Sequence, residues 1–268
     1  MDAASVLNLR GDQAQKGSIR MKIRIKFKKY GSMKFIGHLD VMRYFQKAIR
    51  RASVDIRYSE GFSPHQIMSF AAPLGVGITS KGEYVDIEVL STEDSQTMVN
   101  RLNEVMSEGF EVVSYRELPD ASGNAMSIVA AADYTLTFRP GYEPCDKQTA
   151  QWFKEMAEFF QQPSVMVLKK TKRGQTEMNL KPLIYDLKPI ESQAGEPSLF
   201  MKLSTGSSSN IKPELLLDAY YSHLQQERPP FAFMLEREEV YTDLASDSEK
   251  EAGCHRFISL EALAQEIE

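Results

Sequence analysis

The side chains with the most chemical capability are concentrated in residues 33–77, the stretch MKFIGHLDVMRYFQKAIRRASVDIRYSEGFSPHQIMSFAAPLGVG. His38 lies where a loop leads into a helix, and a histidine there could act as a general base or donate to a phosphate. Ser63 and His65 share one loop, but no Gly-x-Ser-x-Gly context and no orienting acid accompany them. His38 and His65 are therefore the only catalytic candidates, and both are weak. For His38 the structural alternative is a helix-start residue satisfied by backbone groups.

Metal and cofactor chemistry has little support in the sequence. The two cysteines, Cys145 and Cys254, are far apart, and no Cys-x-x-Cys pair or Cys/His cluster of metal-ligand spacing occurs. Gly75 and Gly77 form too short a motif for a dinucleotide fingerprint, and no helix follows them directly. We therefore expect no metal and no cofactor. The low cysteine content indicates a reduced, cytoplasmic setting, and no apolar run approaches the roughly 20 residues of a membrane span.

The same stretch predicts a cationic helix beside an aromatic loop. From residue 37 to about residue 52, apolar residues recur at helical spacing on one side, while Arg43 and Lys47 fall on the other. Tyr58 and Phe62 follow in a loop shaped by glycine and proline, and aromatic rings beside cations can stack on bases. This pattern predicts a surface that holds a polyanion.

Charge is distributed unevenly along the chain. The net charge is −5, yet residues 20–60 carry twelve lysines and arginines against three carboxylates, and the stretch from Glu236 onwards is acidic. Such asymmetry indicates a basic binding face and an acidic tail. Solvation of strand edges and helix backs is the simpler alternative. The candidate nucleic-acid-binding residues are Lys22, Arg24, Lys26, Lys34, His38, Arg43, Lys47, Tyr58, Phe62, His65, Lys170, Lys172 and Arg173.

The elements that must position these residues follow a repeated order. Residues 21–30 alternate apolar and cationic side chains, which predicts a half-buried strand. Further strands are expected at 54–58, 66–72, 82–90 and 110–118, with a second helix capped by Thr92. The order is β-α-β-β-α-β, and it recurs in the second half. The sequence therefore predicts an α+β fold of two tandem ferredoxin-like (βαββαβ) modules with antiparallel sheets.

The predicted organisation has five parts. Residues 1–20 are a disordered leader, 21–118 the first module, 119–132 a linker and 133–242 the second module. Residues 243–268 are an acidic tail that is disordered to about residue 253 and ends in a short helix. The Lys/Arg-rich turn at residues 169–181 contributes to binding only if it shares a face with Arg43 and Lys47.

The motifs FIGHLDVMRYFQKAIRRA, YSEGFSPHQIMSFAAPLGVGITSKGEYVDIEV and NLKPLI resemble the radical-SAM-linked family of bacterial proteins, over about residues 21–241. Members of that family are encoded beside, or fused to, a radical SAM enzyme. The chain has no Cys-x3-Cys-x2-Cys motif of its own. The resemblance thus implies a radical SAM partner and a non-catalytic accessory subunit that binds RNA or presents substrate. Two alternatives stay open: an RNA-processing or RNA-modifying enzyme that uses His38 and His65, and a protein-interaction module that docks an acidic partner.

Overall fold

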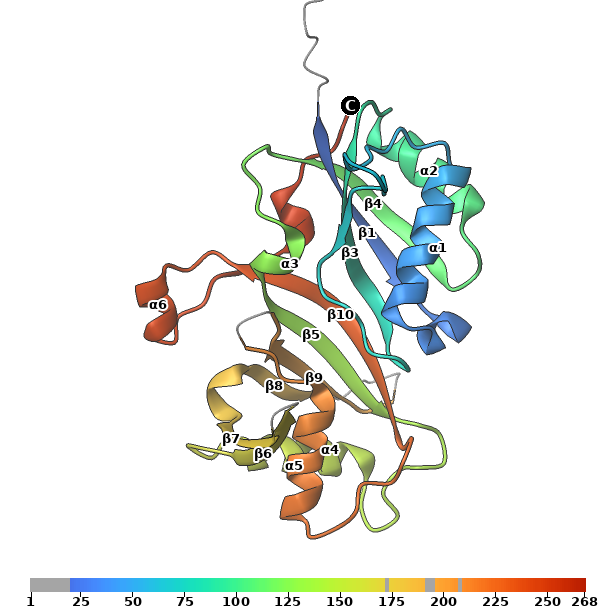
Figure 1. Cartoon of the computed structure of the whole chain (residues 1–268). Coiled ribbons are helices and arrows are strands. Elements are labelled where there is room, and N and C mark those ends of the chain that lie inside the picture. The colour runs from blue at the N-terminus through green and yellow to red at the C-terminus, as the bar shows by residue number, and fades with distance from the viewer. Residues whose placement is uncertain (1–19, 172–173, 191–195, 207–208) are drawn as a thin grey trace, which may run out of the picture.

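The structure is a computed structural model that describes residues 20–171, 174–190, 196–206 and 209–268. The fold is mixed α+β, with six α-helices and one nine-stranded sheet in the described residues (Figure 1). The strand order is β4-β1-β3-β10-β5-β9-β8, with β2 paired to β3 and β11 to β10. Every pairing in this sheet is antiparallel except that of β3 with β10. The sheet is therefore large and mostly antiparallel, as the predicted α+β class requires.

The first half places α1 and α2 on one face of the strands β4, β1 and β3 (Figure 1). Its strand order is β4-β1-β3-β2, because β1 pairs in antiparallel fashion with both β3 and β4 over nearly its whole length. The elements are β1 (Met21–Lys29), the 3-10 helix η1 (Gly31–Phe35), α1 (His38–Arg51), β2 (Met68–Phe70), β3 (Thr79–Val89), α2 (Ser95–Val105) and β4 (Phe110–Leu118).

Aromatic packing fixes α1 on this sheet. The alternation of β1 turns Ile23, Ile25 and Phe27 inward, and each is at most 1% exposed. The Phe27 ring centroid lies 4.4 Å from that of Phe45 on α1, and Phe45 packs edge-on to Phe110 at 5.8 Å. Burying one such side chain stabilises the fold by about 1.5–3 kcal/mol. The predicted apolar face of the helix is thus the face that packs on the sheet.

The second half repeats the arrangement with one insertion. Its strands are ordered β10-β5-β9-β8, and the two-stranded hairpin β6-β7 stands apart from the large sheet. The elements are α3 (Ala125–Ile128), β5 (Val129–Phe138), α4 (Thr149–Phe159), β6 (Met166–Thr171), β7 (Gly174–Asn179), the 3-10 helix η2 (Lys181–Leu183), β8 (Ile184–Ile190), β9 (Ser198–Ser204), α5 (Pro213–His223) and β10 (Phe233–Asp243).

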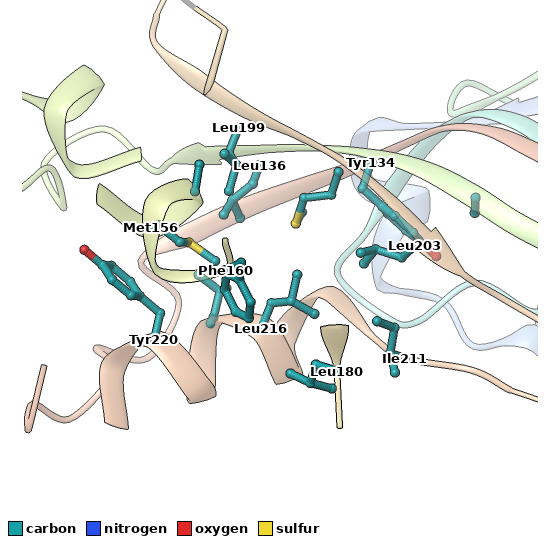
Figure 2. Close-up of a cluster of buried hydrophobic side chains, with 14 of the residues drawn as sticks. Tyr134, Leu136, Met156, Phe160, Leu180, Leu199, Leu203, Ile211, Leu216 and Tyr220 are labelled. Carbon is teal, nitrogen blue, oxygen red and sulfur yellow. The ribbon is translucent and has the colours of Figure 1, made fainter. Parts of the chain in front are cut away.

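A second apolar core lies between α4, α5 and these strands (Figure 2). Trp152 of α4 is 4% exposed, and its ring centroid lies 5.0 Å from those of Phe138 and Tyr220. Leu136, Met156, Leu199, Leu203 and Leu216 are fully buried beside them. Each half therefore has a core of its own.

The two halves share one sheet because β3 and β10 pair in parallel. The register joins Thr79 to Glu236 and Ser80 to Arg237, while β2 occupies the remaining edge of β3. A Cβ at Gly82 would lie 2.8 Å from the carbonyl oxygen of Glu238, so this close approach requires glycine. The sequence predicted a strand at 82–90 and a separate sheet for each half. β3 starts three residues earlier, and those residues make the joint.

The acidic C-terminal region is ordered and returns to the first half, contrary to the expected disorder. Ser246 and Glu249 form a capping box at α6 (Asp247–Glu251), which satisfies the first backbone donors of this short helix. β11 (Phe257–Ser259) and the 3-10 helix η3 (Leu260–Leu263) follow. Glu117 and Gln265 then exchange two backbone hydrogen bonds of 2.8 Å, which tie the segment to β4.

Three smaller expectations differ from the structure. The predicted strand at 54–58 makes only isolated bridges, through Ile56 and Tyr58. Asp94, not Thr92, caps α2, because its carboxylate accepts from the Thr97 backbone N–H. The predicted linker 119–132 contains α3 and the start of β5. Residues 1–19 of the predicted leader lie outside the described residues, and no helix in the described part is long and apolar enough to cross a membrane.

Candidate nucleic-acid interface

α1 presents a cationic face to solvent. Val41, Phe45 and Ile49 on its inner face are at most 6% exposed, whereas Arg43 and Lys47, one turn apart, are exposed. The apolar and cationic residues recur every three to four positions, so a single helix separates them onto opposite sides. The sheet takes the apolar side and leaves the cations outward.

These cations are weakly engaged within the molecule. Arg43 contacts Asp40 at 3.3 Å, but both side chains are more than 60% exposed, and such surface pairs contribute little. Arg50, one turn beyond Lys47, donates to the Gln46 carbonyl oxygen at 3.3 Å, and no carboxylate in the described part of the chain pairs with it. Arg43, Lys47 and Arg50 therefore form a stripe, which we call the α1 stripe, that remains available to an anion.

The loop at residues 59–65 lies against the same helix. Gln66 Nε2 donates to the Gln46 carbonyl oxygen at 3.3 Å, and Gln66 is bridged to Tyr58 across the base of the loop. Ser59 Oγ lies 2.8 Å from His65 Nδ1 and accepts from the His65 backbone N–H at 3.1 Å. These bonds hold the loop while its tip, Phe62, is fully exposed. A bare aromatic ring beside a cationic stripe is a platform on which a base can stack.

A second exposed aromatic ring precedes α1. Phe35 in η1 is 62% exposed, and the Lys34 ammonium lies 5.2 Å from its ring centroid. The loop after β2 packs on the same segment, because Gly77 N–H donates to the Lys34 carbonyl oxygen at 2.7 Å. Leu39, at the start of α1, is 60% exposed. Exposed apolar groups thus lie in η1 and at the start of α1, before the α1 stripe.

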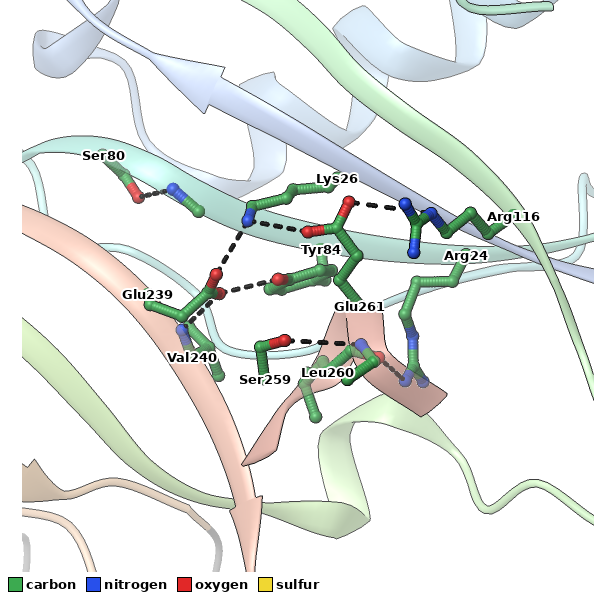
Figure 3. Close-up of polar contacts among 12 residues, drawn as sticks. Arg24, Lys26, Ser80, Tyr84, Arg116, Glu239, Val240, Ser259, Leu260 and Glu261 are labelled. Atoms are coloured by element: carbon green, nitrogen blue, oxygen red, sulfur yellow. Dashed lines mark hydrogen bonds and ion pairs between the residues drawn. The ribbon is translucent and has the colours of Figure 1, made fainter. Parts of the chain in front are cut away.

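The structure removes Arg24 and Lys26 of β1 from the expected basic face (Figure 3). Arg24 is 1% exposed, donates to both Asp86 oxygens at 2.8 Å and donates to the Leu260 carbonyl oxygen at 2.9 Å. Lys26 Nζ contacts Glu239 at 2.7 Å and Glu261 at 3.0 Å. Burial opposes the charge of Lys26, but the two carboxylates raise its pKa above the ordinary value. Both cations are already neutralised, so neither can meet a phosphate.

The remaining predicted cations differ in position. Lys22 Nζ donates to the carbonyl oxygens of Asp120 and Ser122 at 3.0 and 3.4 Å, but no carboxylate in the described residues neutralises it. β6 and β7, which carry the Lys/Arg-rich turn, lie at the opposite end of the molecule from α1 (Figure 1). Lys170 belongs to β6, and Lys172 and Arg173 lie outside the described residues. The hairpin therefore does not share the face of the α1 stripe.

His38 and His65 are not brought to one site. His38 begins α1 and packs edge-on to Phe70, at 5.3 Å between ring centroids. His65 precedes Gln66, which contacts the helix eight residues further along, or about 12 Å along the axis. Partial burial, with a further contribution from the charge of Lys29, lowers the pKa of His38 below 6.5. The arrangement gives no two-histidine catalytic centre.

A buried charge cluster beside His38 was not predicted. Glu83 of β3 is 5% exposed and Arg237 of β10 is 2% exposed. Arg237 Nε donates to one carboxylate oxygen of Glu83 at 2.7 Å, and a second N–H of Arg237 donates to the other oxygen. Arg237 also donates to the Ala72 carbonyl oxygen at 2.5 Å. Lys29, 2% exposed, donates to the Ile36 carbonyl oxygen at 3.2 Å, and burial lowers its pKa. The cavity that His38, Lys29 and Glu83 line holds about 10 Å³, room for about one water. The cluster therefore joins the two halves through Arg237 of β10 and Glu83 of β3.

No group of three or more His, Cys, Asp or Glu side chains in the described residues is arranged to hold a metal ion. The two cysteines are exposed free thiols.

The fold and this surface define a mixed α+β protein with an exposed basic helix flanked by aromatic rings. The model of a family described as an uncharacterised protein conserved in bacteria, DUF2344, matches residues 22–213. The chain belongs to this family. No curated protein matches it.

Similarity to solved structures is weak. A chain in the crystal structure of a Cbf5-Nop10-Gar1 complex is 9% identical with a TM-score of 0.43, over 81% of this chain and 48% of that one. A dye-decolorizing protein from V. cholerae is 10% identical with a TM-score of 0.20, over 82% and 91% of the two chains. The chain spans about half the length of the first of these. Neither likeness carries an argument about function.

Proposed function

We propose that this chain is a non-catalytic RNA-binding subunit that presents substrate to a radical SAM enzyme. The observation that carries the RNA part is the exposed α1 stripe, Arg43, Lys47 and Arg50, with the exposed rings of Phe35 and Phe62 in the segments that precede and follow α1 in the chain. Cations that track a backbone and rings that stack on unpaired bases are the two parts of a single-strand binding surface. The radical SAM partner rests on the resemblance of the motifs at residues 35–52, 58–89 and 179–184 to the radical-SAM-linked family.

The proposal includes a finer description of the fold. Both halves have the element order βαββαβ, and the strand orders β4-β1-β3-β2 and β10-β5-β9-β8 correspond position by position. We interpret them as two tandem ferredoxin-like modules joined through β3 and β10, with β6-β7 inserted in the second. The exposed thiols of Cys145 and Cys254 fit a reduced, cytoplasmic setting.

Binding of a fluorescein-labelled single-stranded RNA, followed by anisotropy over a series of salt concentrations, tests the RNA part. Each lost phosphate contact lowers the salt slope by about 0.7, so Arg43→Ala/Lys47→Ala is expected to reduce it by about 1.4. Phe62→Ala is expected to weaken binding by about 1–3 kcal/mol with the slope unchanged, because the ring contributes stacking and no charge.

Lys154→Ala is the matched control, since Lys154 is an exposed lysine on the helix α4 of the second half. If wild-type protein does not bind RNA at low salt, or if the Lys154 and α1 variants behave alike, the RNA part is wrong. Co-purification with the radical SAM enzyme from nuclease-treated lysate, lost in Arg43→Ala/Lys47→Ala, would instead assign the α1 stripe to an acidic protein partner.

A further inference from the structure

A large cavity lies far from α1, between β6 and α5. It has a volume of about 810 Å³. One wall consists of four consecutive residues, Val165 to Leu168, which means that the edge of the strand lines it, since a strand face would contribute alternate residues. The other wall is Leu215, Asp218, Ala219 and Ser222, a single stripe of α5 at helical spacing. The cavity is therefore a groove between a strand edge and a helix.

The β6 edge has no backbone partner among the described residues. β6 pairs only with β7, and the backbone hydrogen bonds of Val165 also run to that side, to Asn179 and Leu180. Met166 and Leu168 are 57% and 60% exposed. An unpaired edge with apolar side chains is a template for another strand.

The two outer edges of the large sheet, β8 and β4, are protected in the usual ways. β8, at one end of the large sheet, contains Pro189 and the charged pair Asp186 and Lys188. β4, at the other end, carries charges along its length and is bridged to Gln265. Only β6 combines three successive apolar edge residues with an adjacent groove in the described part. This difference points to an occupant.

The groove also has a polar requirement at one end. Glu214, in the first turn of α5, has a buried Oε2 atom with no hydrogen-bond partner in the described structure. Leaving such an acceptor unpaired costs about 1–3 kcal/mol. Glu214 is only half-buried and lines the groove, so a rotation of its side chain would bring this oxygen to a lysine or arginine of an occupant.

We propose that the groove binds an extended segment of a partner protein as a third strand on β6. The segment is apolar at alternate residues, which pack against Met166, Leu168 and the α5 stripe, and it carries a basic residue for Glu214. Backbone hydrogen bonds to β6 supply affinity, and the groove selects the side chains. This site lies at the opposite end of the molecule from the α1 stripe, so it does not depend on RNA binding.

Selection of short random peptides displayed on phage against the immobilised full chain tests the proposal. Enriched sequences are expected to alternate apolar residues with a lysine or arginine at one end. The synthetic consensus peptide should lose at least about tenfold in affinity, 1.4 kcal/mol, to Leu168→Lys, and again to Ala219→Trp, which fills the groove. The same peptide N-methylated at alternate backbone nitrogens should lose as much.

Val113→Lys is the matched control, because Val113 is an exposed apolar residue on the edge strand β4. Leu168 is exposed, so its replacement should leave the thermal unfolding midpoint unchanged. The proposal is overturned if no peptide is enriched, if the consensus binds Leu168→Lys and Ala219→Trp as it binds wild type, or if only Val113→Lys loses it. A concentration-dependent dimer that Leu168→Lys abolishes would overturn it too, by assigning the edge to a second copy.

Discussion

The buried carboxylate of Glu83 lies between cations from two different strands, Arg237 at contact distance and Lys29 across a small cavity. Each of the three side chains is at most 5% exposed. Removing charged groups from water is costly, and the pair is tolerated because the guanidinium satisfies both carboxylate oxygens. Such a pair specifies which strands meet, because a shift in the register of β10 against β3 would leave both charges buried and unpaired.

Arg237→Met is expected to lower the free energy of unfolding by about 3–5 kcal/mol, because Glu83 would remain buried without its partner. Urea denaturation measures the loss. The double variant Glu83→Gln/Arg237→Met should lose clearly less than the sum of the two single variants. Additive losses would contradict this role for the pair.

His38 gives a pH dependence of known sign. Its folded-state pKa is lowered, so below about pH 6.5 the unfolded chain binds a proton that the folded chain does not. Protonation therefore opposes folding, and stability should fall as pH drops through 6.5. His38→Gln should give a shallower loss of unfolding free energy between neutral and mildly acidic pH, measured by urea titration; parallel curves would contradict the argument.

At the scale of elements, α1 divides two tasks between its faces. The inner face, with Phe45 and Ile49, holds the helix on β1 and β4, while the outer face carries Arg43 and Lys47. Because one set is buried against the sheet and the other is exposed, stability and binding can be altered separately.

Phe45→Ala is expected to destabilise the protein by about 3–5 kcal/mol, since the ring is 1% exposed among Phe27, Phe70 and Phe110. Lys47→Ala, on the outer face of the same helix, should stay within about 0.5 kcal/mol. Thermal or urea unfolding of the two variants makes the comparison, and equal losses would be inconsistent with the packing of α1.

At the scale of the whole molecule, the C-terminal segment closes the first half. Leu260 is fully buried and accepts from Arg24, while Glu261 contacts Lys26 and Arg116. Tyr84 completes this network by donating to Glu239 at 2.6 Å, and burial raises its pKa. Glu261 of the acidic C-terminal region is thus paired with cations of the first half, whereas Asp247 and Glu266 remain exposed.

Removal of residues 257–268 is expected to reduce stability by more than about 3 kcal/mol, from the lost burial of Leu260 and the lost partners of two cations. The same truncation removes Glu261, Glu266 and Glu268 and leaves Arg24 and Lys26 with one carboxylate partner each, Asp86 and Glu239. The folded fraction should therefore elute from heparin at higher salt than wild type. Unchanged unfolding and elution would contradict the covering role of this segment.

The local elements could be predicted from the sequence because their signals are local. The alternation of Ile23, Ile25 and Phe27 predicted β1, the helical spacing predicted α1, and residues 110–118 form β4 with the expected bounds. The strand expected at 54–58 failed because the chain there has no long partner, only single bridges at Ile56 and Tyr58.

The candidate surface could be predicted only in part, for a physical reason. Whether a lysine or arginine faces a ligand depends on which carboxylates reach it, and these can come from any distance along the chain. The Arg24 contact to Leu260 spans 236 residues, and Arg237 lies 154 residues from Glu83. The sequence around Arg24 in β1 does not show that it is buried, and the sequence around Arg43 in α1 does not show that it is exposed. In the described residues, the carboxylate that Arg43 contacts is Asp40, three residues away.

The cover over β1 also has a consequence for biosynthesis. Leu260 and Glu261 leave the ribosome more than 230 residues after Arg24 and Lys26. At about 5–20 residues per second, that interval is roughly 10–50 seconds. During this time β1 of the nascent chain lacks its C-terminal cover while it is close to the ribosome, which is itself a polyanion. The exposure ends when β11 and η3 pack on the first half.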